Sequence, residues 1–555
     1  MRKYFLLLLI YNLFACNKVT TYDIIIRNAI IYNGNGGVPF KGDIAINADT
    51  IAAIGDVQNS KAIDEIDARG MAVAPGFSNM MGHSEETLFQ DSRALSDVKQ
   101  GVTMEVFGES SFAPLNAKMK IQLQEGQGDI KYKVSWNTLG EYMNTLEKKG
   151  IAVNISSFVG TGTIRQYVLG EDNIAPDKRQ LDSMKMLVDQ AMEEGALGVT
   201  NALIYPPDFF AKTDELIALS KEASKYGGTY SSHIRSEGNK FTQAVQELIT
   251  ISKEANIPAH IYHLKAGGKN NWSKMDTVIK MVETARASGL QITADMYTYL
   301  AGATGLTSSF PPTLQDGGFG KLWERLHNPV IRKQMIAAMN TNANDWENLY
   351  YGTGGPEHVL LLSFKQDSLK KYTGKTLDEV AKLMGKSPEE TAMDLIIADS
   401  TRVGVAYFLM SEDNVKKQVA LPWVSFGSDE GSYSPEGVFL KSQPHPRAYG
   451  NFAKVLGHYS RDEKIFSLQQ AIYQLAKLPV ETLKIKKRGE LKAGNYADII
   501  IFDASKVNDL ATYDQPHQFA TGMIDVIVNG KLILKNGEPT NATPGRFVMG
   551  PGSKK

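Results

Sequence analysis

The 555-residue sequence has a single cysteine, Cys16, and almost no excess of charge of either sign. One cysteine excludes a disulfide within the chain and a cysteine-rich zinc site. The 60 Lys and Arg residues nearly balance the 61 Asp and Glu residues, and no segment concentrates basic residues. This balance gives no indication of nucleic-acid binding. Beyond the N-terminus, no segment is long and apolar enough to span a membrane.

The N-terminus combines a basic start with a short apolar run. Arg2 and Lys3 precede residues 5–10, which are apolar but too few to cross a bilayer. Leu13-Phe14-Ala15-Cys16 then resembles the lipobox at which bacterial lipoproteins are cleaved and lipidated. We expect residues 1–16 to be a lipoprotein signal peptide and Cys16 to carry a lipid anchor. That predicts a protein of the bacterial cell envelope, on the periplasmic or the outer face. The alternative is an uncleaved hydrophobic N-terminus with an incidental cysteine.

Short strands are predicted at both ends of the chain. Residues 22–70 hold three apolar runs, and glycines mark a tight connection between the first two. Residues 486–548 return to short strands, among them Met523-Ile-Asp-Val-Ile-Val. Neither piece has enough strands to bury a face alone. We therefore expect both pieces to combine in one small β-sandwich domain.

Between these pieces, residues 71–485 repeat the order strand, loop, helix. Eight such units predict an α/β protein with a (β/α)8 barrel of the TIM type. The interval from about 310 to 405 is too long for a plain loop and holds the helix-start pattern Thr376-x-x-Glu379, so we expect a mostly helical insertion near the rim. The eight predicted strands cover residues 71–77, 101–108, 150–155, 195–200, 229–233, 259–263, 289–297 and 423–429.

The fifth and sixth predicted strands end near His233 and His263 and flank an amphipathic segment at residues 243–256. A strand, helix, strand unit makes its two strands parallel, so both histidines are expected on the same rim of the barrel. Two imidazoles on neighbouring strand ends suit one divalent metal ion. The alternative is that both are core histidines whose hydrogen bonds are satisfied.

Other predicted strands also end in polar residues, where core packing alone would favour apolar ones. His83, Glu109, Tyr205, Asp295 and Asp429 lie at or just past carboxyl-terminal strand ends. Active sites of barrel enzymes lie on this face. The pattern predicts an active site there, although a structural cap is an alternative role for Asp429.

Several motifs carry a family resemblance that covers nearly all of the chain after residue 22. Ala74-Pro-Gly-Phe and Gly489-x-Leu-x-x-Gly494 resemble the amidohydrolase superfamily. Longer motifs are similar to the D-aminoacylases, or N-acyl-D-amino-acid deacylases: Leu203-Ile-Tyr-Pro-Pro, Ser232-His-Ile-Arg-Ser-Glu-Gly, His263-Leu-Lys, Asp295-Met-Tyr-Thr-Tyr, Gly427-Ser-Asp429 and His445-Pro-Arg-Ala-Tyr-Gly450. The resemblance implies a zinc-dependent hydrolase whose substrates are N-acyl-D-amino acids or dipeptides with D-residues.

Two positions depart from the family pattern. The family's first strand ends in a His-x-His pair, whereas Met81-Gly82-His83 supplies one histidine. Many members have a metal-binding cysteine after the second strand, whereas this chain has Glu109. Because a carboxylate is a good zinc ligand, the resemblance implies one tightly bound zinc ion held by Glu109, His233 and His263. His83 is a further candidate ligand.

The resemblance also implies roles for the remaining site residues. Asp429 is expected to take a proton from zinc-activated water and to return it to the leaving amine. Lys265, Arg447 and Tyr205 are expected to hold the α-carboxylate of the substrate, which suits an ammonium and a guanidinium. For Lys265 and Arg447 the alternative is an ordinary ion pair. Tyr297 either lines the pocket or packs against its neighbours.

Two other functions are open from the sequence alone. The histidine missing at Met81 favours a binding lipoprotein that kept the barrel and lost turnover, whereas the retained histidines and Asp429 favour an enzyme. A hydrolase of cyclic amides from the same superfamily is the other alternative. Those hydrolases lack the stretch at His445-Pro-Arg, so they fit this sequence less well.

Overall fold

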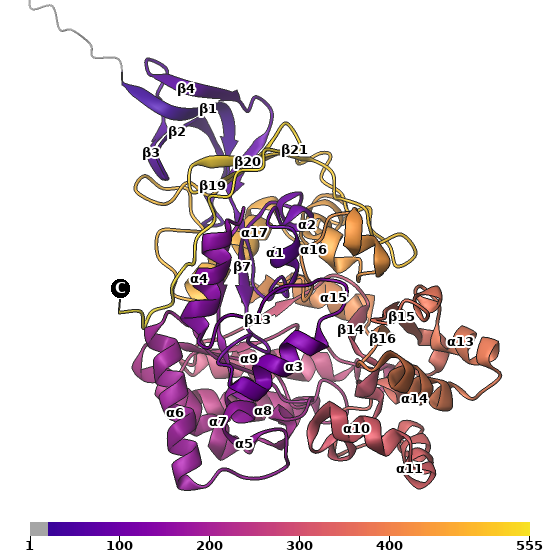
Figure 1. Ribbon diagram of the computed structural model, residues 1–555. Helices are drawn as coiled ribbons and strands as arrows, with labels where there is room; N and C mark the ends of the chain where they lie inside the picture. Colours follow the sequence, from indigo (N-terminus) through magenta and orange to yellow (C-terminus); the bar gives the residue numbers. More distant parts are fainter. Residues whose placement is uncertain (1–19, 555) are drawn as a thin grey trace, which may run out of the picture.

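The computed structural model describes residues 20–554, so the predicted signal peptide and Cys16 lie outside the described residues. Figure 1 shows a β domain at the top, a barrel in the middle and an inserted segment at the lower right. Within the described part of the chain, no helix has the length and apolar character needed to span a membrane.

The β domain is one sheet built from both ends of the chain. Its strand order is β21-β20-β19-β18-β5-β1-β2-β3, with β4 beside β1, and the pairing of β18 with β5 joins the two ends. The sheet covers a cluster of buried side chains that includes Ile26, Ile44, Ile499 and Ile527. The small β domain that was predicted from both chain ends is confirmed. Its strands form one continuous sheet rather than the two separate sheets of a β-sandwich. Its strands are β1 (Thr21–Ile31), β2 (Phe40–Asn47), β3 (Thr50–Gly55), β4 (Lys61–Asp67), β5 (Ala72–Pro75), β18 (Ile499–Phe502), β19 (Met523–Val528), β20 (Lys531–Lys535) and β21 (Glu538–Pro539).

The last described residues leave this domain. Gly545 N donates to Ile151 O and Gly550 N donates to Gly195 O, each at 2.8 Å. Residues 545–550 therefore run along the amino-terminal side of the barrel, whereas the sequence placed residues up to 548 in the β domain. A Cβ on Gly545 would lie 2.0 Å from Val153 O, so this close approach requires glycine.

The predicted (β/α)8 barrel is confirmed. Neighbouring strands pair in parallel from β6 to β8 and from β9 to β17, and only Phe158 separates β8 from β9, which together form the third strand. Met80 N donates to Phe426 O at 3.1 Å and closes the ring between the first and last strands. The barrel strands are β6 (Phe77–Asn79), β7 (Val102–Phe107), β8 (Asn154–Ser157), β9 (Val159–Gly160), β10 (Gly198–Ala202), β11 (Thr229–His233), β12 (Ala259–Ile261), β13 (Ile292–Met296) and β17 (Val424–Phe426).

The first predicted strand divides at Gly76. β5 belongs to the β domain, whereas β6 begins the barrel. A Cβ on Gly76 would lie 2.2 Å from Thr103 Oγ1, so only glycine permits the chain to pass this close to β7. The sequence predicted a single strand because its apolar run is continuous across the two sheets.

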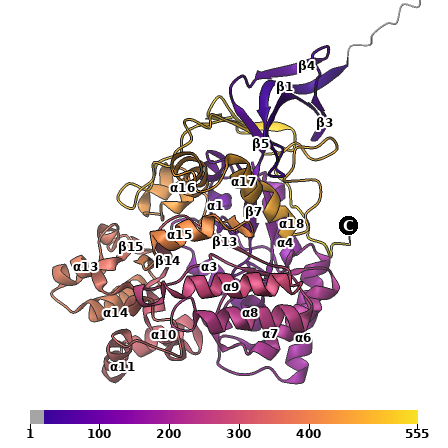
Figure 2. The ribbon, with the colours of Figure 1, turned by 180° about the vertical axis from the view of Figure 1, so that it is seen from behind.

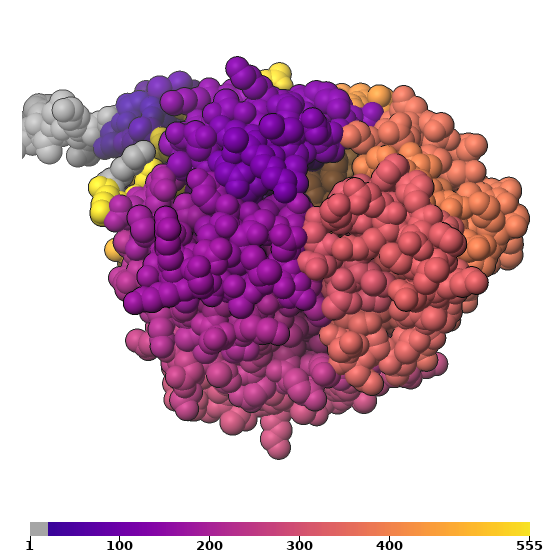
Figure 3. Space-filling view, turned by 60° about the horizontal axis from the view of Figure 1, so that its bottom comes forward, coloured from indigo at the N-terminus to yellow at the C-terminus, as the bar shows by residue number. Residues whose placement is uncertain are grey.

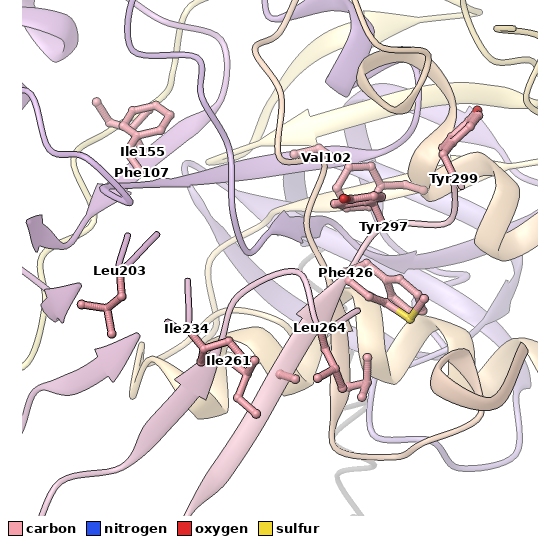
Figure 4. Close-up of a cluster of buried hydrophobic side chains, with 14 of the residues drawn as sticks. Val102, Phe107, Ile155, Leu203, Ile234, Ile261, Leu264, Tyr297, Tyr299 and Phe426 are labelled. Atoms are coloured by element: carbon pink, nitrogen blue, oxygen red, sulfur yellow. The ribbon is translucent and has the colours of Figure 1, made fainter. Parts of the chain in front are cut away.

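Strand residues of the barrel are buried on both faces. Every residue of β7, β10 and β11 is buried, because one face packs against the helices and the other fills the interior. Figure 4 shows part of this core, where side chains from strands far apart in the sequence meet; those labelled are Val102, Phe107, Ile155, Leu203, Ile234, Ile261, Leu264, Tyr297, Tyr299 and Phe426.

Helices cover the outside of the barrel. Figure 2 shows α6, α7, α8 and α9 in a row, in agreement with their pairwise packing. Thr138 and Asp177 form capping boxes that begin α4 and α6. The helices that follow barrel strands are α1 (Thr87–Gln90), α2 (Leu95–Val98), α3 (Ala117–Gly126), α4 (Leu139–Lys149), α5 (Thr161–Leu169), α6 (Lys178–Glu193), α7 (Thr213–Lys225), α8 (Phe241–Ala255), α9 (Lys274–Ala287), α15 (Glu412–Val419), α16 (Arg447–Lys454), α17 (Leu468–Ile472) and α18 (Leu478–Thr482).

The insertion contains an antiparallel sheet as well as the predicted helices. Three strands pair in the order β14-β16-β15, and β14 begins before the predicted boundary at 310. The sequence missed these strands because each is a five-residue run that periodicity cannot separate from a buried helix turn. The elements of the insertion are β14 (Ala301–Gly305), α10 (Gly318–Leu326), α11 (Pro329–Met339), α12 (Leu349–Thr353), β15 (Val359–Ser363), α13 (Leu377–Met384), α14 (Pro388–Asp399) and β16 (Gly404–Phe408).

Candidate functional site

A cavity of about 360 Å³ lies at the carboxyl ends of the barrel strands, with the inserted sheet as one wall. In the view of Figure 3, the surface is hollowed between the violet N-terminal part and the salmon insertion. All but one of the residues that the sequence predicted at or near this face line the cavity, the exception being Asp295; those that line it are His83, Glu109, Tyr205, His233, His263, Lys265, Tyr297, Asp429 and Arg447.

His233 and His263 meet at the ends of β11 and β12, as their parallel strands predicted. Their ring centroids are 4.3 Å apart, and both side chains are buried. Glu109 follows β7 and places its Oε1 2.8 Å from His233 Nδ1 and 3.5 Å from His263 Nε2. The three predicted ligands thus form one group, whose ligand atoms all lie within 4.8 Å of one another.

This donor set suits a zinc ion. Catalytic zinc sites use three protein ligands, drawn from histidine, carboxylate and cysteine, and keep one position open. Burial and Lys265 lower the pKa of His263, but the carboxylates of Glu237 and Glu109 outweigh them and raise it to about 9. Zinc must displace a proton from the His263 imidazole before it can bind there. The affinity of the site for zinc is therefore expected to fall as the pH falls below about 9.

Glu109 also belongs to a second group of possible metal ligands, which it joins through its other carboxylate oxygen. Oε2 lies 3.5 Å from His83 Nε2, which lies 3.2 Å from Asp429 Oδ1. The ligand atoms of His83, Glu109 and Asp429 also lie within 4.8 Å of one another. The sequence made a second metal position doubtful because Met81 replaces a histidine, but folding brings Asp429 to that position. This group holds one imidazole where the first group holds two.

Asp429 lies between His83 and Arg447. Arg447 Nη1 is 2.8 Å from Asp429 Oδ2, and Arg447 Nη2 donates to the Asp429 carbonyl at 2.6 Å. Burial raises the pKa of Asp429, but Arg447 and His83 outweigh burial and hold that pKa well below its usual range. The carboxylate is therefore ionised at neutral pH. Its backbone φ of 51° falls in the left-handed region, a strain that functional sites often contain.

Buried donors without partners line the same cavity. Among the described residues, Tyr297 Oη and Arg447 Nε have no hydrogen-bond partner, whereas Arg447 Nη1 forms an ion pair with Asp429 Oδ2 at 2.8 Å. The Arg447 guanidinium lies 4.3 Å and Lys265 Nζ 5.5 Å from the Tyr297 ring centre. A Cβ on Gly302 of β14 would lie 3.3 Å from Tyr297 Oη, so glycine leaves space beside the hydroxyl. Buried donors of this kind suit an anionic ligand.

Tyr205 lies beside the other histidine. Its ring packs edge-on against His233 at 5.3 Å, whereas Tyr297 packs against His263 at 6.5 Å. A cationic neighbour is Arg402, whose guanidinium lies 4.9 Å from the Tyr205 ring centre. The sequence predicted that Tyr205 binds the substrate together with Lys265 and Arg447. In the structure Tyr205 follows β10, Lys265 follows β12 and Arg447 begins α16, and all three line the cavity.

Asp295 ends a strand without reaching the cavity. Its Oδ1 accepts a hydrogen bond from the backbone N–H of His263 at 2.8 Å. Its Oδ2 lies 2.8 Å from His260 Nε2. Asp295 is buried and does not line the cavity. It therefore fixes the backbone that carries His263.

Comparison with known proteins identifies the family. Residues 64–534 match the model of the Amidohydrolase family. The chain belongs to the amidohydrolase family. The metal-dependent hydrolase predicted from the sequence is thereby confirmed at the level of the family, which is metal-dependent.

Full-length relatives confirm the resemblance of this amidohydrolase to the D-aminoacylases. A D-aminoacylase of Alcaligenes xylosoxydans xylosoxydans is 28% identical over 532 residues, which cover 95% of this chain and 97% of the relative. An N-acyl-D-glutamate deacylase of Bordetella bronchiseptica, solved with zinc and a phosphonate inhibitor, superposes with a TM-score of 0.79 at 25% identity, covering 95% of this chain and 100% of its own. A D-aminoacylase with a binuclear metal centre superposes with a TM-score of 0.79 at 28% identity and the same coverage.

The amidohydrolase site also contains Glu237, which the sequence analysis did not assign. Glu237 Oε1 lies 2.9 Å from His263 Nδ1 and 2.6 Å from Lys265 Nζ, and Oε2 lies 3.8 Å from His233 Nε2. Burial raises the pKa of Glu237, but Lys265 and the two histidines outweigh burial and lower it to about 2. A signal was available, because Glu237 stands four residues after His233 in the motif Ser232-His-Ile-Arg-Ser-Glu-Gly.

We expect Glu237→Gln to weaken zinc binding about 10- to 100-fold, the usual effect of removing the carboxylate that orients a metal-binding histidine. Competition with a coloured zinc chelator measures this affinity directly. Glu347→Gln is the matched control, because Glu347 is a neighbouring glutamate that bonds Ser236 and neither histidine. Equal zinc affinity in wild type and Glu237→Gln would show that Glu109 and the backbone alone orient the two rings.

Proposed function

We propose that this amidohydrolase removes the acyl group from N-acyl-D-amino acids, or cleaves dipeptides with D-residues, at a zinc site formed by Glu109, His233 and His263. We further propose that one zinc ion is held tightly there, since the second group has a single imidazole. One observation carries the proposal. A metal-ligand group and buried, unpartnered donors for a carboxylate line the same cavity.

The unpartnered donors support an amino-acid substrate. An α-carboxylate placed between Tyr297 Oη and the Arg447 guanidinium would give partners to two buried donor atoms that have none, Tyr297 Oη and Arg447 Nε. Lys265 stands on the same side of the site, with its Nζ held by Glu237. An anion bound here leaves the adjoining amide free to extend toward Glu109 and the histidines.

The relatives support the handedness. Two relatives that match over nearly the whole chain are named as a D-aminoacylase and an N-acyl-D-glutamate deacylase. In physical terms, handedness depends on where the carboxylate donors lie relative to the metal ligands.

When bound at this site, zinc supplies a Lewis acid that polarises a carbonyl oxygen and lowers the pKa of water. Asp429 then accepts a proton from the water that attacks the amide carbon and gives it to the departing amine nitrogen. Arg447 contacts this carboxylate through Nη1 and keeps its Nε without a partner, so it would also contact a substrate carboxylate bound beside it. An anion bound beside Arg447 offsets its positive charge, which raises the pKa of Asp429 and makes it a stronger base.

The decisive assay offers N-acetyl-D- and N-acetyl-L-amino acids with varied side chains to the zinc-loaded protein. We expect cleavage of the D series and little of the L series. Equal rates on the two series would overturn the assignment of handedness. Absence of any amide cleavage with zinc in place would favour a binding protein.

Arg447→Met should raise KM for the cleaved substrate by about 10- to 100-fold, the range for a lost hydrogen bond to a charged group. If the guanidinium holds the carboxylate equally in the ground and transition states, kcat changes less than KM. Steady-state kinetics measure both constants. A fall confined to kcat would instead assign Arg447 to the support of Asp429, which it also contacts.

We also propose a lipid anchor on Cys16, which would place the enzyme in the bacterial cell envelope, on the periplasmic or the outer face. The short apolar run and the sequence Leu13-Phe14-Ala15-Cys16 support it. Expression of the full chain should yield membrane-bound protein with a fatty-acylated N-terminus, and Cys16→Ala should release it or leave it unprocessed. Wild-type protein found only in the soluble fraction would contradict the anchor.

A further inference from the structure

We propose that Asn79 is a positioning residue for the hydrolysis, because its side-chain amide holds the turn that carries Asp429 and so fixes the direction of the general base. Asn79 is the last residue of β6 and is fully buried. It does not line the cavity, and the sequence analysis gave it no role. The inference rests on the proposed function, since it concerns the carboxylate to which that function assigns the proton.

Asn79 binds the residue before Asp429 through both ends of its amide. Its Oδ1 accepts a hydrogen bond from Ser428 N at 2.9 Å, and its Nδ2 donates to Ser428 Oγ at 2.8 Å. Asn79 and Ser428 are 349 positions apart in the sequence and meet where the first and last barrel strands close the ring. The two hydrogen bonds fix both the backbone and the side chain of Ser428, so the peptide that leads into Asp429 cannot rotate freely.

The Asp429 backbone needs such support because its φ of 51° lies in the left-handed region. A residue other than glycine keeps this conformation only when the surrounding contacts impose it. On one side, Asn451 Nδ2 donates to Gly427 O at 2.8 Å. On the other side, Arg447 Nη2 donates to the Asp429 carbonyl at 2.6 Å. Asn79 holds the residue between these two contacts, so the whole turn is fixed by side chains from other parts of the barrel.

Two buried carboxyl groups and the Ser428 backbone together leave the Asn79 amide one orientation. Asn79 Nδ2 lies 3.4 Å from both Asp97 Oδ1 and Glu105 Oε2, besides its hydrogen bond to Ser428 Oγ. A flipped amide would direct Nδ2 at the Ser428 N–H, which is itself a donor, and would direct Oδ1 at the carboxyl oxygens. The amide oxygen therefore faces the Ser428 backbone, as holding the turn requires.

Glu105 also holds the far end of the loop that carries Asp429. Ser84 Oγ donates to Glu105 Oε1 at 3.0 Å and accepts a hydrogen bond from Ser432 N at 2.8 Å. Through Asn79 and Ser84, the loop is attached on both sides of Asp429 to one buried side chain. Two points of attachment define the position of the loop, whereas a single one would let it pivot.

The loss expected on removing Asn79 lies in the rate rather than in binding. Asn79 belongs to neither metal group and does not line the cavity. Zinc affinity and KM should therefore change little. A displacement of about 1 Å at a reacting group can cost about 10²-fold in rate even when the changed residue lies away from the chemistry. Because the general base is such a group, kcat should fall.

The test measures kcat, KM and zinc content of the full zinc-loaded chain with Asn79→Ala. We expect kcat to fall about 10- to 100-fold, with zinc retained and KM nearly unchanged. Asn154→Ala is the matched control. Asn154 is an equally buried asparagine of β8 that binds Asp498 and Asn529. This control should lower the melting temperature but keep the wild-type kcat.

A second comparison separates positioning from general support of the fold. Combined with Asp429→Asn, Asn79→Ala should change kcat by a factor of about one, because the group that Asn79 positions no longer accepts a proton. Crystal structures of wild type and Asn79→Ala give a readout that needs no turnover. They should show the Asp429 carboxylate displaced from its place between His83 and Arg447.

A wild-type kcat in Asn79→Ala would overturn the proposal, and so would an equal fold-loss of kcat with and without Asp429→Asn. If Asn79→Ala does not fold, Asn79→Ser replaces it under the same criteria, since its hydroxyl keeps a polar group among the buried oxygens but is one bond shorter than the amide oxygen. If the wild type cleaves no amide, the proposed function fails by itself. The crystal structures then decide, and an Asp429 that keeps its φ and its contact with Arg447 in Asn79→Ala would overturn the positioning role.

Discussion

Asp429→Asn should lower kcat by at least ~10²-fold while zinc stays bound, which is the usual scale for removing a general base. The amide keeps the size of the side chain but cannot accept the proton of the attacking water. A 10²-fold loss corresponds to about 2.7 kcal/mol of transition-state free energy. Steady-state kinetics on the cleaved N-acetyl-D-amino acid measure the loss, and elemental analysis of the same sample measures the zinc.

Zinc content is essential to this experiment, because Asp429 also belongs to the second candidate metal group with His83 and Glu109. A variant that keeps one zinc ion per chain and loses turnover supports the role of Asp429 as the base. Near-full turnover with zinc in place would show that another group takes the proton. Two zinc ions that survive dialysis of the wild type would contradict the proposal of one tightly bound ion.

Glu109→Gln should lose zinc and activity together. Glu109 lies between His233, His263 and His83, and it is the only carboxylate of the first metal group within the described residues. An amide removes the negative charge that offsets the charge of the ion. We expect zinc affinity to fall by at least ~10²-fold, the upper end of the effect of losing an outer carboxylate. Chelator competition measures the affinity, and kinetics with excess zinc show whether activity returns.

Glu86→Gln is a suitable control for this variant. Glu86 is a half-buried glutamate near the same face that accepts a hydrogen bond from Tyr132 and belongs to neither metal group. It should bind zinc as tightly as the wild type. If Glu109→Gln also retained wild-type affinity, the ion would have to be held by the histidines with a different third ligand, and the assignment of Glu109 would be wrong.

Elements with a strong local pattern were predictable from the sequence. The barrel strands are short apolar runs followed by helices, and the two histidines lie together because a strand, helix, strand unit is parallel. Glu109 was predictable as a neighbour of these histidines because it ends another strand of the same barrel. The antiparallel sheet of the insertion was not predictable, since β15 and β16 are brief apolar runs without a distinctive period.

Tertiary structure decided what local patterns do not encode, namely the distances between residues far apart in the chain. The sequence determined by itself that the chain forms a (β/α)8 barrel with a β domain, and that polar side chains end its strands on one face. Folding decided that Asp429 stands beside His83 and so completes a second candidate metal group, and that the Arg402 guanidinium packs over the ring of Tyr205. The physical reason is that strand period and helix period are properties of adjacent residues, whereas a contact between strand ends depends on the closure of the whole barrel.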